Sequence, residues 1–255
     1  MTKKHIIDFI ILSNEKVAEG YHLLILRPDA LQTLPEMHPG QFVEIRVPDS
    51  ANTFLRRPIS INFVQGNQLW LMIKDAGEGT HHLCEMQRGE ILNIILPLGN
   101  GFSLETGNDV LLVGGGVGAA PLLYLAAKLK EQGKNVRILI GARKQADLTQ
   151  ISDFEKYGTV GITTEDGSAG TKGFVTDHAW LRNLSTGVIK CCGPLPMMKA
   201  VAAVAKKAGV NCEVSLENKM ACGVGACLCC VEDTVHGNEC VCTAGPVFDI
   251  NHLKW

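Results

Sequence analysis

Short apolar runs separated by turn-forming residues fill the first hundred positions of the chain. Gly, Pro, Asn and Asp interrupt these runs at short intervals, which is typical of β-strands joined by tight turns. Strands are expected over residues 6–12, 22–26, 42–47, 59–64, 69–73 and 91–96. Strands at this spacing predict an antiparallel barrel or sandwich, which we assign to residues 1–101.

The pattern changes after residue 101, where buried strands begin to alternate with apolar helices. The strands are expected over residues 110–113, 136–140, 160–163, 187–191 and 212–216. The helices are expected over residues 119–132, from about 147, over 175–181 and over 196–208. This alternation predicts a doubly wound parallel sheet with helices on both faces, over residues 102–216.

The remaining segment, residues 217–255, is too short and too rich in Cys and Gly to build a core of its own. Such a segment needs a cross-link to be stable, and a metal centre can provide one. Six of the ten cysteines lie here: Cys222, Cys227, Cys229, Cys230, Cys240 and Cys242. A disulfide framework is typical of small secreted chains, whereas Asp8, Asn14 and Glu15 interrupt any signal-peptide core, so we expect a cytoplasmic protein with reduced thiols.

Charge gives no reason to expect nucleic acid or an anionic membrane as a partner. Lys and Arg number 24 against 26 Asp and Glu, for a formal net charge of −2. The longest uncharged stretch, residues 110–127, is just long enough to span a membrane. Its central glycines and Pro121 favour a strand, a turn and a helix instead.

Three of the clustered cysteines have the spacing of an iron-sulfur loop. Cys222, Cys227 and Cys230 form C-x4-C-x2-C, which is the spacing of the plant-type [2Fe-2S] ferredoxin loop. Gly223 and Gly225 lie in the first gap, where residues without a Cβ allow the backbone to wrap closely around a cluster.

The fourth ligand is Cys240 or Cys242, which the spacing alone does not decide. In an extended chain these two side chains would point the same way, about two strand rises apart, so we expect only one to reach a cluster. Cys229 is interpreted as a packed bystander. Four thiolates also suit a structural Zn²⁺ site, but zinc ligands usually come as two C-x2-C pairs.

A glycine-rich turn follows the first strand of the parallel sheet and opens a helix. Its glycines are Gly114, Gly115, Gly116 and Gly118. Such a turn can bring backbone N–H groups to a pyrophosphate, and tight packing of strand and helix is the alternative explanation. The strand before the turn and the helix after it favour the nucleotide role. The next strand ends at Arg143 without an acidic residue, so NADH and NADPH both remain open. A second half-site is Cys192-Gly193-Pro194, which alternatively is just a helix start with proline in its first turn.

In the β-rich part, Arg57-Pro58-Ile59-Ser60 carries a candidate phosphate-binding arginine. Arginine binds phosphate through two parallel hydrogen bonds, and the proline after it favours an extended backbone that would fix its direction. Two surface arginines, however, need no ligand. Gly79 and Thr80 form a second flexible turn, whose simplest interpretation is a hairpin loop.

The order of these motifs resembles the ferredoxin reductase-like flavoproteins. The stretches 216–227 and 242–248 narrow the resemblance to the electron transfer subunits of NAD-dependent, class 1B dihydroorotate dehydrogenases, over the whole chain. The resemblance implies an FAD-binding barrel, an NAD(P)-binding α/β domain and a [2Fe-2S] segment. Members of the family commonly have Tyr-Arg where this chain has Ile73-Lys74, and the gap from Cys230 to Cys242 is short, which predicts a trimmed hairpin.

The resemblance also implies a set of site residues. FAD would be bound by Arg57, Pro58, Ile59, Ser60, Met72, Ile73, Lys74, Gly79 and Thr80, with Arg57 toward the pyrophosphate and Ser60 toward the isoalloxazine. NAD(H) would be bound by Gly114, Gly115, Gly116, Gly118, Cys192, Gly193 and Pro194. The cluster would be held by Cys222, Cys227, Cys230 and Cys242, the last favoured over Cys240 because it stands shortly before residues 245–248.

The implied function is an electron relay from NAD(H) through FAD and the cluster to FMN in a separate catalytic subunit. That partner would interconvert dihydroorotate and orotate in pyrimidine biosynthesis, in a heterotetramer of two copies of each subunit. No residue of this chain would act as a catalytic acid or base, since the cofactors carry the chemistry. The alternatives are a subunit of a ferredoxin:NADP or sulfide-type oxidoreductase and, outside redox chemistry, a zinc-stapled nucleotide-binding regulator.

Overall fold

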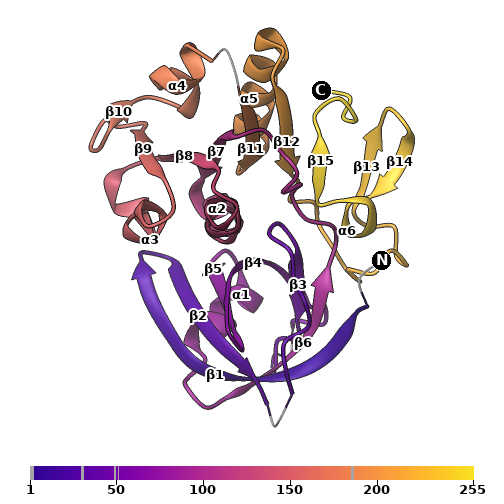
Figure 1. Ribbon diagram of the computed structural model, residues 1–255. Helices are drawn as coiled ribbons and strands as arrows, with labels where there is room; N and C mark the ends of the chain where they lie inside the picture. The colour runs from indigo at the N-terminus through magenta and orange to yellow at the C-terminus, as the bar shows by residue number, and fades with distance from the viewer. Residues whose placement is uncertain (1–2, 30–31, 49, 51, 185–186) are drawn as a thin grey trace.

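The computed structural model describes residues 3–29, 32–48, 50, 52–184 and 187–255, and its N-terminal part is a closed antiparallel barrel (Figure 1). The strands follow the order β1-β2-β5-β4-β3-β6 around the barrel. Their bounds are β1 His5–Ala18, β2 Tyr21–Pro28, β3 Phe42–Ile45, β4 Arg57–Gln65, β5 Gln68–Lys74 and β6 Ile91–Leu98. All six expected strands are confirmed. Alternate side chains such as Phe9, Ile11 and Leu71 fill the barrel, as a half-buried strand requires.

One helix, α1 (Glu78–Glu85), connects β5 to β6, so the interpretation of Gly79 and Thr80 as a hairpin loop is wrong. The hydroxyl group of Thr80 explains where this helix begins. Its Oγ1 accepts hydrogen bonds from the N–H groups of Ala76 at 2.9 Å and Gly77 at 3.1 Å. The threonine thereby satisfies backbone donors just before the first turn, where an uncapped helix would leave them unpaired.

The second part of the molecule is a sheet in the order β10-β9-β8-β7-β11-β12-β15. The strands are β7 Asp109–Gly115, β8 Asn135–Ala142, β9 Thr159–Thr164, β10 Thr171–Lys172, β11 Val188–Cys192, β12 Asn211–Ser215 and β15 Val247–Asp249. All neighbours are parallel except β15, which pairs antiparallel with β12. The expected doubly wound sheet is confirmed, whereas the two edge strands β10 and β15 were not predicted from the apolar pattern.

Helices cover both faces of this sheet, because consecutive residues of its strands point in opposite directions. Val110 and Leu112 of β7 pack with α2 and α3, whereas Leu111 and Val113 pack with α4 and α5. The bounds are α2 Ala120–Glu131, α3 Ile151–Glu155, α4 Ala179–Arg182 and α5 Leu195–Ala208, with 3₁₀ turns at Gly116–Ala119, Gln145–Asp147 and Val175–Asp177. The continuous helix expected over residues 175–181 is wrong. His178 has an extended backbone there and its ring nitrogen caps the short α4 by accepting a hydrogen bond from the N–H of Trp180.

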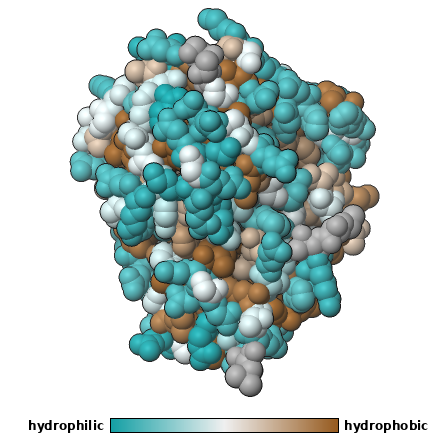
Figure 2. Space-filling view, viewed as in Figure 1, coloured by the Kyte–Doolittle hydropathy of each residue, from teal (hydrophilic) through white to brown (hydrophobic). Residues whose placement is uncertain are grey.

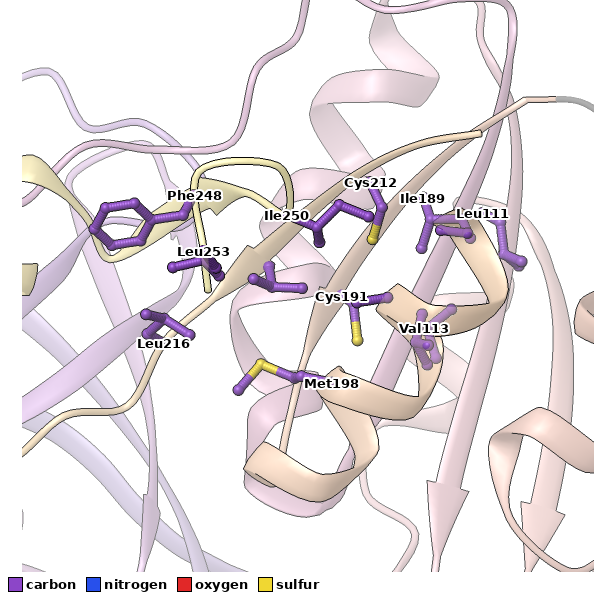
Figure 3. Packing of buried hydrophobic residues seen from close by; sticks show 14 of the residues in the cluster. Leu111, Val113, Ile189, Cys191, Met198, Cys212, Leu216, Phe248, Ile250 and Leu253 are labelled. Atoms are coloured by element: carbon purple, nitrogen blue, oxygen red, sulfur yellow. The ribbon is translucent and has the colours of Figure 1, made fainter. Parts of the chain in front are cut away.

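The C-terminal segment lies beside the sheet and shares its core. It contains the hairpin β13 (Val231–Thr234) and β14 (Gly237–Cys240), the short helix α6 (Val241–Ala244) and β15. The residues between Cys230 and Cys242 form this hairpin, and its being shorter than in relatives stays a prediction. Figure 3 shows Phe248, Ile250 and Leu253 of this segment in one hydrophobic cluster with residues of the sheet such as Leu111 and Ile189. The division of the chain at residues 216 and 217 stays a prediction.

The surface mixes polar and apolar side chains. Figure 2 shows hydrophobic residues scattered among hydrophilic ones on the face that it views. The most exposed large hydrophobic side chain of the described residues is Phe54, which lies just before β4. In the described ranges, the helices are all too short or too polar to cross a membrane.

Candidate functional site

The structure brings the candidate phosphate-binding residues of the barrel together. Arg57 begins β4, and its side chain lies against the first turn of α1. A Cβ atom placed at Gly79 would lie 2.6 Å from Arg57 Nε, so glycine at this position lets the guanidinium group lie directly against the helix turn. A guanidinium group beside unpaired N–H groups of a helix N-terminus is a suitable environment for a pyrophosphate. The pair therefore fits the diphosphate of FAD.

The β5 residues of the predicted FAD site divide between two faces. Ile73 is fully buried in the barrel core, so only its backbone can meet a cofactor. Met72 and Lys74 point the other way, toward the α/β part, where Met72 packs with Tyr21 and Ala120. Lys74 Nζ lies 5.9 Å from the centre of the Tyr21 ring.

A pocket of about 640 Å³ opens between the barrel and the carboxyl ends of the parallel strands. Tyr21 and Lys74 line it from the barrel, and Gly115, Gly116 and Pro194 line it from the sheet. Ligands of open α/β folds bind at this edge of the sheet. The pocket is therefore lined by part of each predicted half-site for NAD(H), and Tyr21 is a lining residue that the sequence analysis missed.

The predicted NAD(H) residues that do not line the pocket contribute close packing. A Cβ atom at Gly114 would lie 2.9 Å from Ala119, and one at Gly118 would lie 2.5 Å from Gly193 Cα. Gly118 thus lets the two half-sites approach each other. Cys192 is buried beneath them, at 1% exposure.

Two acidic residues that the sequence analysis did not connect with the dinucleotide also line the pocket. Asp147 and Glu165 lie with Arg143 at the ends of neighbouring strands. Strand β8 itself ends without an acidic residue. Carboxyl groups nevertheless reach the pocket, because Glu165 follows the end of β9 and Asp147 lies in the turn after β8. Nothing in the local pattern around either residue indicates this placement.

The loop from Cys222 to Cys230 wraps around its own sulfur atoms. The N–H of Val224 donates to Cys222 Sγ at 3.4 Å, and the N–H of Cys242 donates to Cys230 Sγ at 3.4 Å. Gly223 and Gly225 have φ values of 64° and 86°, which favour glycine. A Cβ atom at Gly225 would lie 2.8 Å from Thr243 Cγ2. Three candidate thiols on a glycine-rich loop that directs N–H groups at sulfur, with the thiol of Cys242 beside Cys230, fit a [2Fe-2S] cluster.

The thiols of this loop influence one another. Burial works against ionisation of Cys222, but N–H groups of Val224, Cys227 and Ala226 outweigh it and lower its pKa to about 6. Burial and the neighbouring Cys230 raise the pKa of Cys242 to about 12. In the part of the chain that the structure describes, no group of three or more Cys, His, Asp or Glu side chains is already arranged to hold a metal ion. The ligand set therefore stays a prediction.

Cys240 and Cys242 do not lie on one extended strand, so the geometry assumed for them does not apply, and which of them reaches a cluster stays a prediction. Cys240 ends β14 and Cys242 lies within α6, because the chain turns into the helix between them. Both side chains lie near Cys230. They differ in burial, since Cys242 is 1% exposed and Cys240 is partly exposed.

A second cavity, of about 740 Å³, lies at the amino ends of strands β11 and β12, at the other end of the sheet from the first pocket. It is lined by Lys190 and Glu213, whose side chains form a salt bridge of 2.8 Å, and by Asp249. None of the predicted site residues lines it.

Comparisons with known proteins connect these sites. Residues 217–254 match the family model described as the iron-sulfur cluster binding domain of dihydroorotate dehydrogenase B, and residues 112–203 match an oxidoreductase NAD-binding domain. The dihydroorotate dehydrogenase B (NAD(+)) electron transfer subunit of Caldanaerobacter subterraneus subsp. tengcongensis is 41% identical over 242 residues, covering 93% of this chain and 94% of the relative. That of Clostridium perfringens is 39% identical over 241 residues, 94% of each chain. This chain belongs to that family of electron transfer subunits.

Solved structures agree with an electron transfer subunit of this family. A chain from the structure of NADH-dependent reduced ferredoxin-NADP oxidoreductase is 31% identical with a TM-score of 0.87, covering 97% of this chain and 90% of that one. The FAD/NAD-binding domain of nitric oxide dioxygenase from Vibrio cholerae has a TM-score of 0.72 at 21% identity, over 80% of this chain and 94% of that one, which shows the fold alone. The chain is therefore an oxidoreductase component, and the zinc-stapled regulator loses its support.

Proposed function

We propose that this electron transfer subunit carries electrons between NAD(H) and the FMN of a dihydroorotate dehydrogenase catalytic subunit, through FAD and a [2Fe-2S] cluster. The observation that carries the proposal is the arrangement of the three predicted sites around the barrel. The NAD(H) pocket opens onto the barrel at Tyr21 and Lys74. The predicted FAD segment on β4 pairs with β3, and the cysteine loop packs against β3 from outside.

The barrel residues would bind and orient FAD. Arg57 and the first turn of α1 at Gly79 hold the diphosphate, and Ser60 lies three residues further along β4, toward the isoalloxazine. Thr80 keeps that helix turn in place through its hydrogen bonds to the backbone. When bound, FAD accepts two electrons with a hydride and the iron-sulfur cluster carries one electron at a time.

The pocket residues would position the nicotinamide cofactor. Gly115 and Gly116 present backbone to the diphosphate without side chains in the way, and Pro194 begins the second half-site. Cys222, Cys227, Cys230 and Cys242 would ligate the iron. Thiolate ligands are favoured here because backbone N–H groups already point at Cys222.

The surface around the cysteine loop supports transfer to a partner. Leu228 is 65% exposed, and Val224 and Val231 are also exposed beside it. An apolar patch beside an exposed Cys227 is suitable for docking another redox protein. The family resemblance, and not this surface, is the basis on which we propose a complex of two electron transfer subunits and two catalytic subunits.

The experiment is co-expression with a dihydroorotate dehydrogenase catalytic subunit. We expect co-purification, about one FAD and about two irons per chain, and NADH oxidation that depends on orotate. A colourless protein that holds zinc would contradict the proposal. The likeness to a ferredoxin-NADP oxidoreductase chain supports a second candidate, and co-purification with a large flavin- and iron-sulfur-containing partner of the glutamate synthase type would favour it.

A further inference from the structure

A buried carboxyl group lies between the barrel and the cysteine loop. Val43 and Ile45 of β3 point into the barrel core, so Phe42 and Glu44 point outward. An outward position on a barrel strand is usually solvated, yet Glu44 is 0% exposed. Something outside the barrel must therefore cover it.

The cover is the cysteine loop itself. A Cβ atom at Gly223 would lie 2.7 Å from Glu44 Cγ and 3.0 Å from its Oε1, with Leu98 completing the contact at 3.1 Å. The loop backbone therefore rests directly on the glutamate side chain, one residue after Cys222. Gly225 has no such contact, because its missing side chain faces Thr243.

Ion pairing does not explain why a carboxyl group occupies this position. Neither carboxyl oxygen of Glu44 has a hydrogen-bond partner among the residues that the structure describes. Arg56 donates to two backbone carbonyl oxygens, that of Asn93 at 2.8 Å and that of Glu44 itself at 3.3 Å, but not to the carboxyl group. Arg57 donates to the carbonyl oxygen of Leu55 at 3.0 Å. A buried acceptor without a partner costs about 1–3 kcal/mol, which calls for a compensating role.

The position of Glu44 in the sheet suggests that role. Across the strand pair, Glu44 lies opposite Pro58 and Phe42 lies opposite Ser60, both in the predicted FAD segment. On its other side it meets the loop of the predicted iron ligands. We propose that Glu44 is a positioning residue that holds the cysteine loop against the FAD-binding strands, and thereby fixes the separation between flavin and cluster. This inference rests on the proposed function.

A double-variant experiment tests the contact. Gly223→Ala should lose most of the iron bound by the reconstituted full-length protein, because its Cβ meets Glu44. Adding Glu44→Ala should restore a substantial part of that iron, because the space is vacated. Gly225→Ala is the matched control: its backbone is equally left-handed, but Glu44→Ala should not rescue it. Iron, acid-labile sulfide and visible circular dichroism are measured for each variant.

Electron transfer tests the positioning role. In stopped-flow reduction by NADH, Glu44→Ala should slow reduction of the cluster by the flavin severalfold, because the separation of the two centres is no longer fixed. The preceding reduction of the flavin should keep its rate. Glu44→Gln, which has nearly the same shape, should recover most of the lost rate, and Glu15→Gln on exposed β1 should match the wild type.

The two arms separate the inference from the proposed function. The inference alone is overturned by three results together. The wild-type protein binds iron, Glu44→Ala does not rescue Gly223→Ala, and Glu44→Ala reduces the cluster at the wild-type rate. Wild-type protein that binds no iron overturns the proposed function, and the inference with it. Rescue of Gly223→Ala but not of Gly225→Ala, with the slower rate in Glu44→Ala, supports the inference.

Discussion

The α/β sheet and the cysteine-rich segment are stabilised in different ways. Strand β7 is buried on both faces along nearly its whole length, and residues 110–114 of it each pair with two neighbouring strands. The segment after residue 216 has only a two-stranded hairpin, a one-turn helix and β15, and its apolar side chains pack into the core of the sheet. Repeated local patterns thus specify the first region, whereas the second depends on its neighbours and on its cysteines.

The largest expected effect is at the cysteines. Cys242→Ser should abolish cluster binding, because it removes one of four predicted ligands. Cys240→Ser should keep the cluster, because the partly exposed Cys240 is predicted to be a bystander. Iron content and the visible spectrum of the purified variants check this. The reverse result would exchange the roles of the two cysteines.

The second largest effect is expected on the free energy of unfolding, when a side chain that the C-terminal segment contributes to the core of the sheet is removed. Phe248→Ala should destabilise the protein by about 3–5 kcal/mol, because Phe248 is 4% exposed in the common cluster. Denaturant unfolding measured by far-UV circular dichroism should show the loss for the whole fold. Phe174→Ala, at a side chain that is 64% exposed, should change stability by no more than about 0.5 kcal/mol. If Phe248→Ala affected only the cluster absorbance, the segment would be an independent unit.

A smaller effect is expected on FAD binding, at the predicted diphosphate site formed by Arg57 and the first turn of α1. Arg57→Ala should weaken FAD binding by about 1.5–3 kcal/mol, roughly 10- to 150-fold in Kd, since charge-assisted hydrogen bonds have this strength. Fluorescence titration of the flavin-free protein with FAD gives the Kd. Arg88→Ala, at an exposed arginine in the turn before β6, serves as the control and should leave the Kd unchanged. Equal Kd values for wild type and Arg57→Ala would contradict the assignment.

The smallest effect is expected at Lys74. Lys74→Ala should raise the KM for NADH by about fivefold, because an exposed charge is worth no more than about 1 kcal/mol. Steady-state NADH oxidation with an artificial electron acceptor measures it. Iron content should be unchanged, since Lys74 lines the pocket and not the cysteine loop. A KM equal to that of the wild type would place the nicotinamide cofactor away from Lys74.

The sequence predicted the six barrel strands and the main parallel strands because their apolar patterns are long and regular. It missed β15 because this short strand forms only where β12 offers a free sheet edge. It missed α1 because the first turn of this helix contains Gly79 and Thr80, and glycine and threonine are equally typical of turns. It predicted one helix over residues 175–181, where His178 instead caps a shorter one.

The candidate site shows the same division. The spacing of Cys222, Cys227 and Cys230 specifies the kind of centre, because ligand chemistry and loop length are local properties. The contact of Gly79 with Arg57, the lining of the pocket by Tyr21 and the burial of Glu44 involve residues far apart in the chain. No local pattern contains such information.

The sequence by itself therefore determined which chemistry this protein carries: a thiolate loop, a glycine turn after a buried strand and an arginine-proline turn. Only the tertiary structure decided how these motifs face one another. The physical reason is that periodicity and spacing report on neighbours along the chain, whereas the separation of cofactor sites depends on how the barrel, the sheet and the cysteine loop pack. Glu44, which lies where the loop meets the barrel, has a role that only this packing reveals.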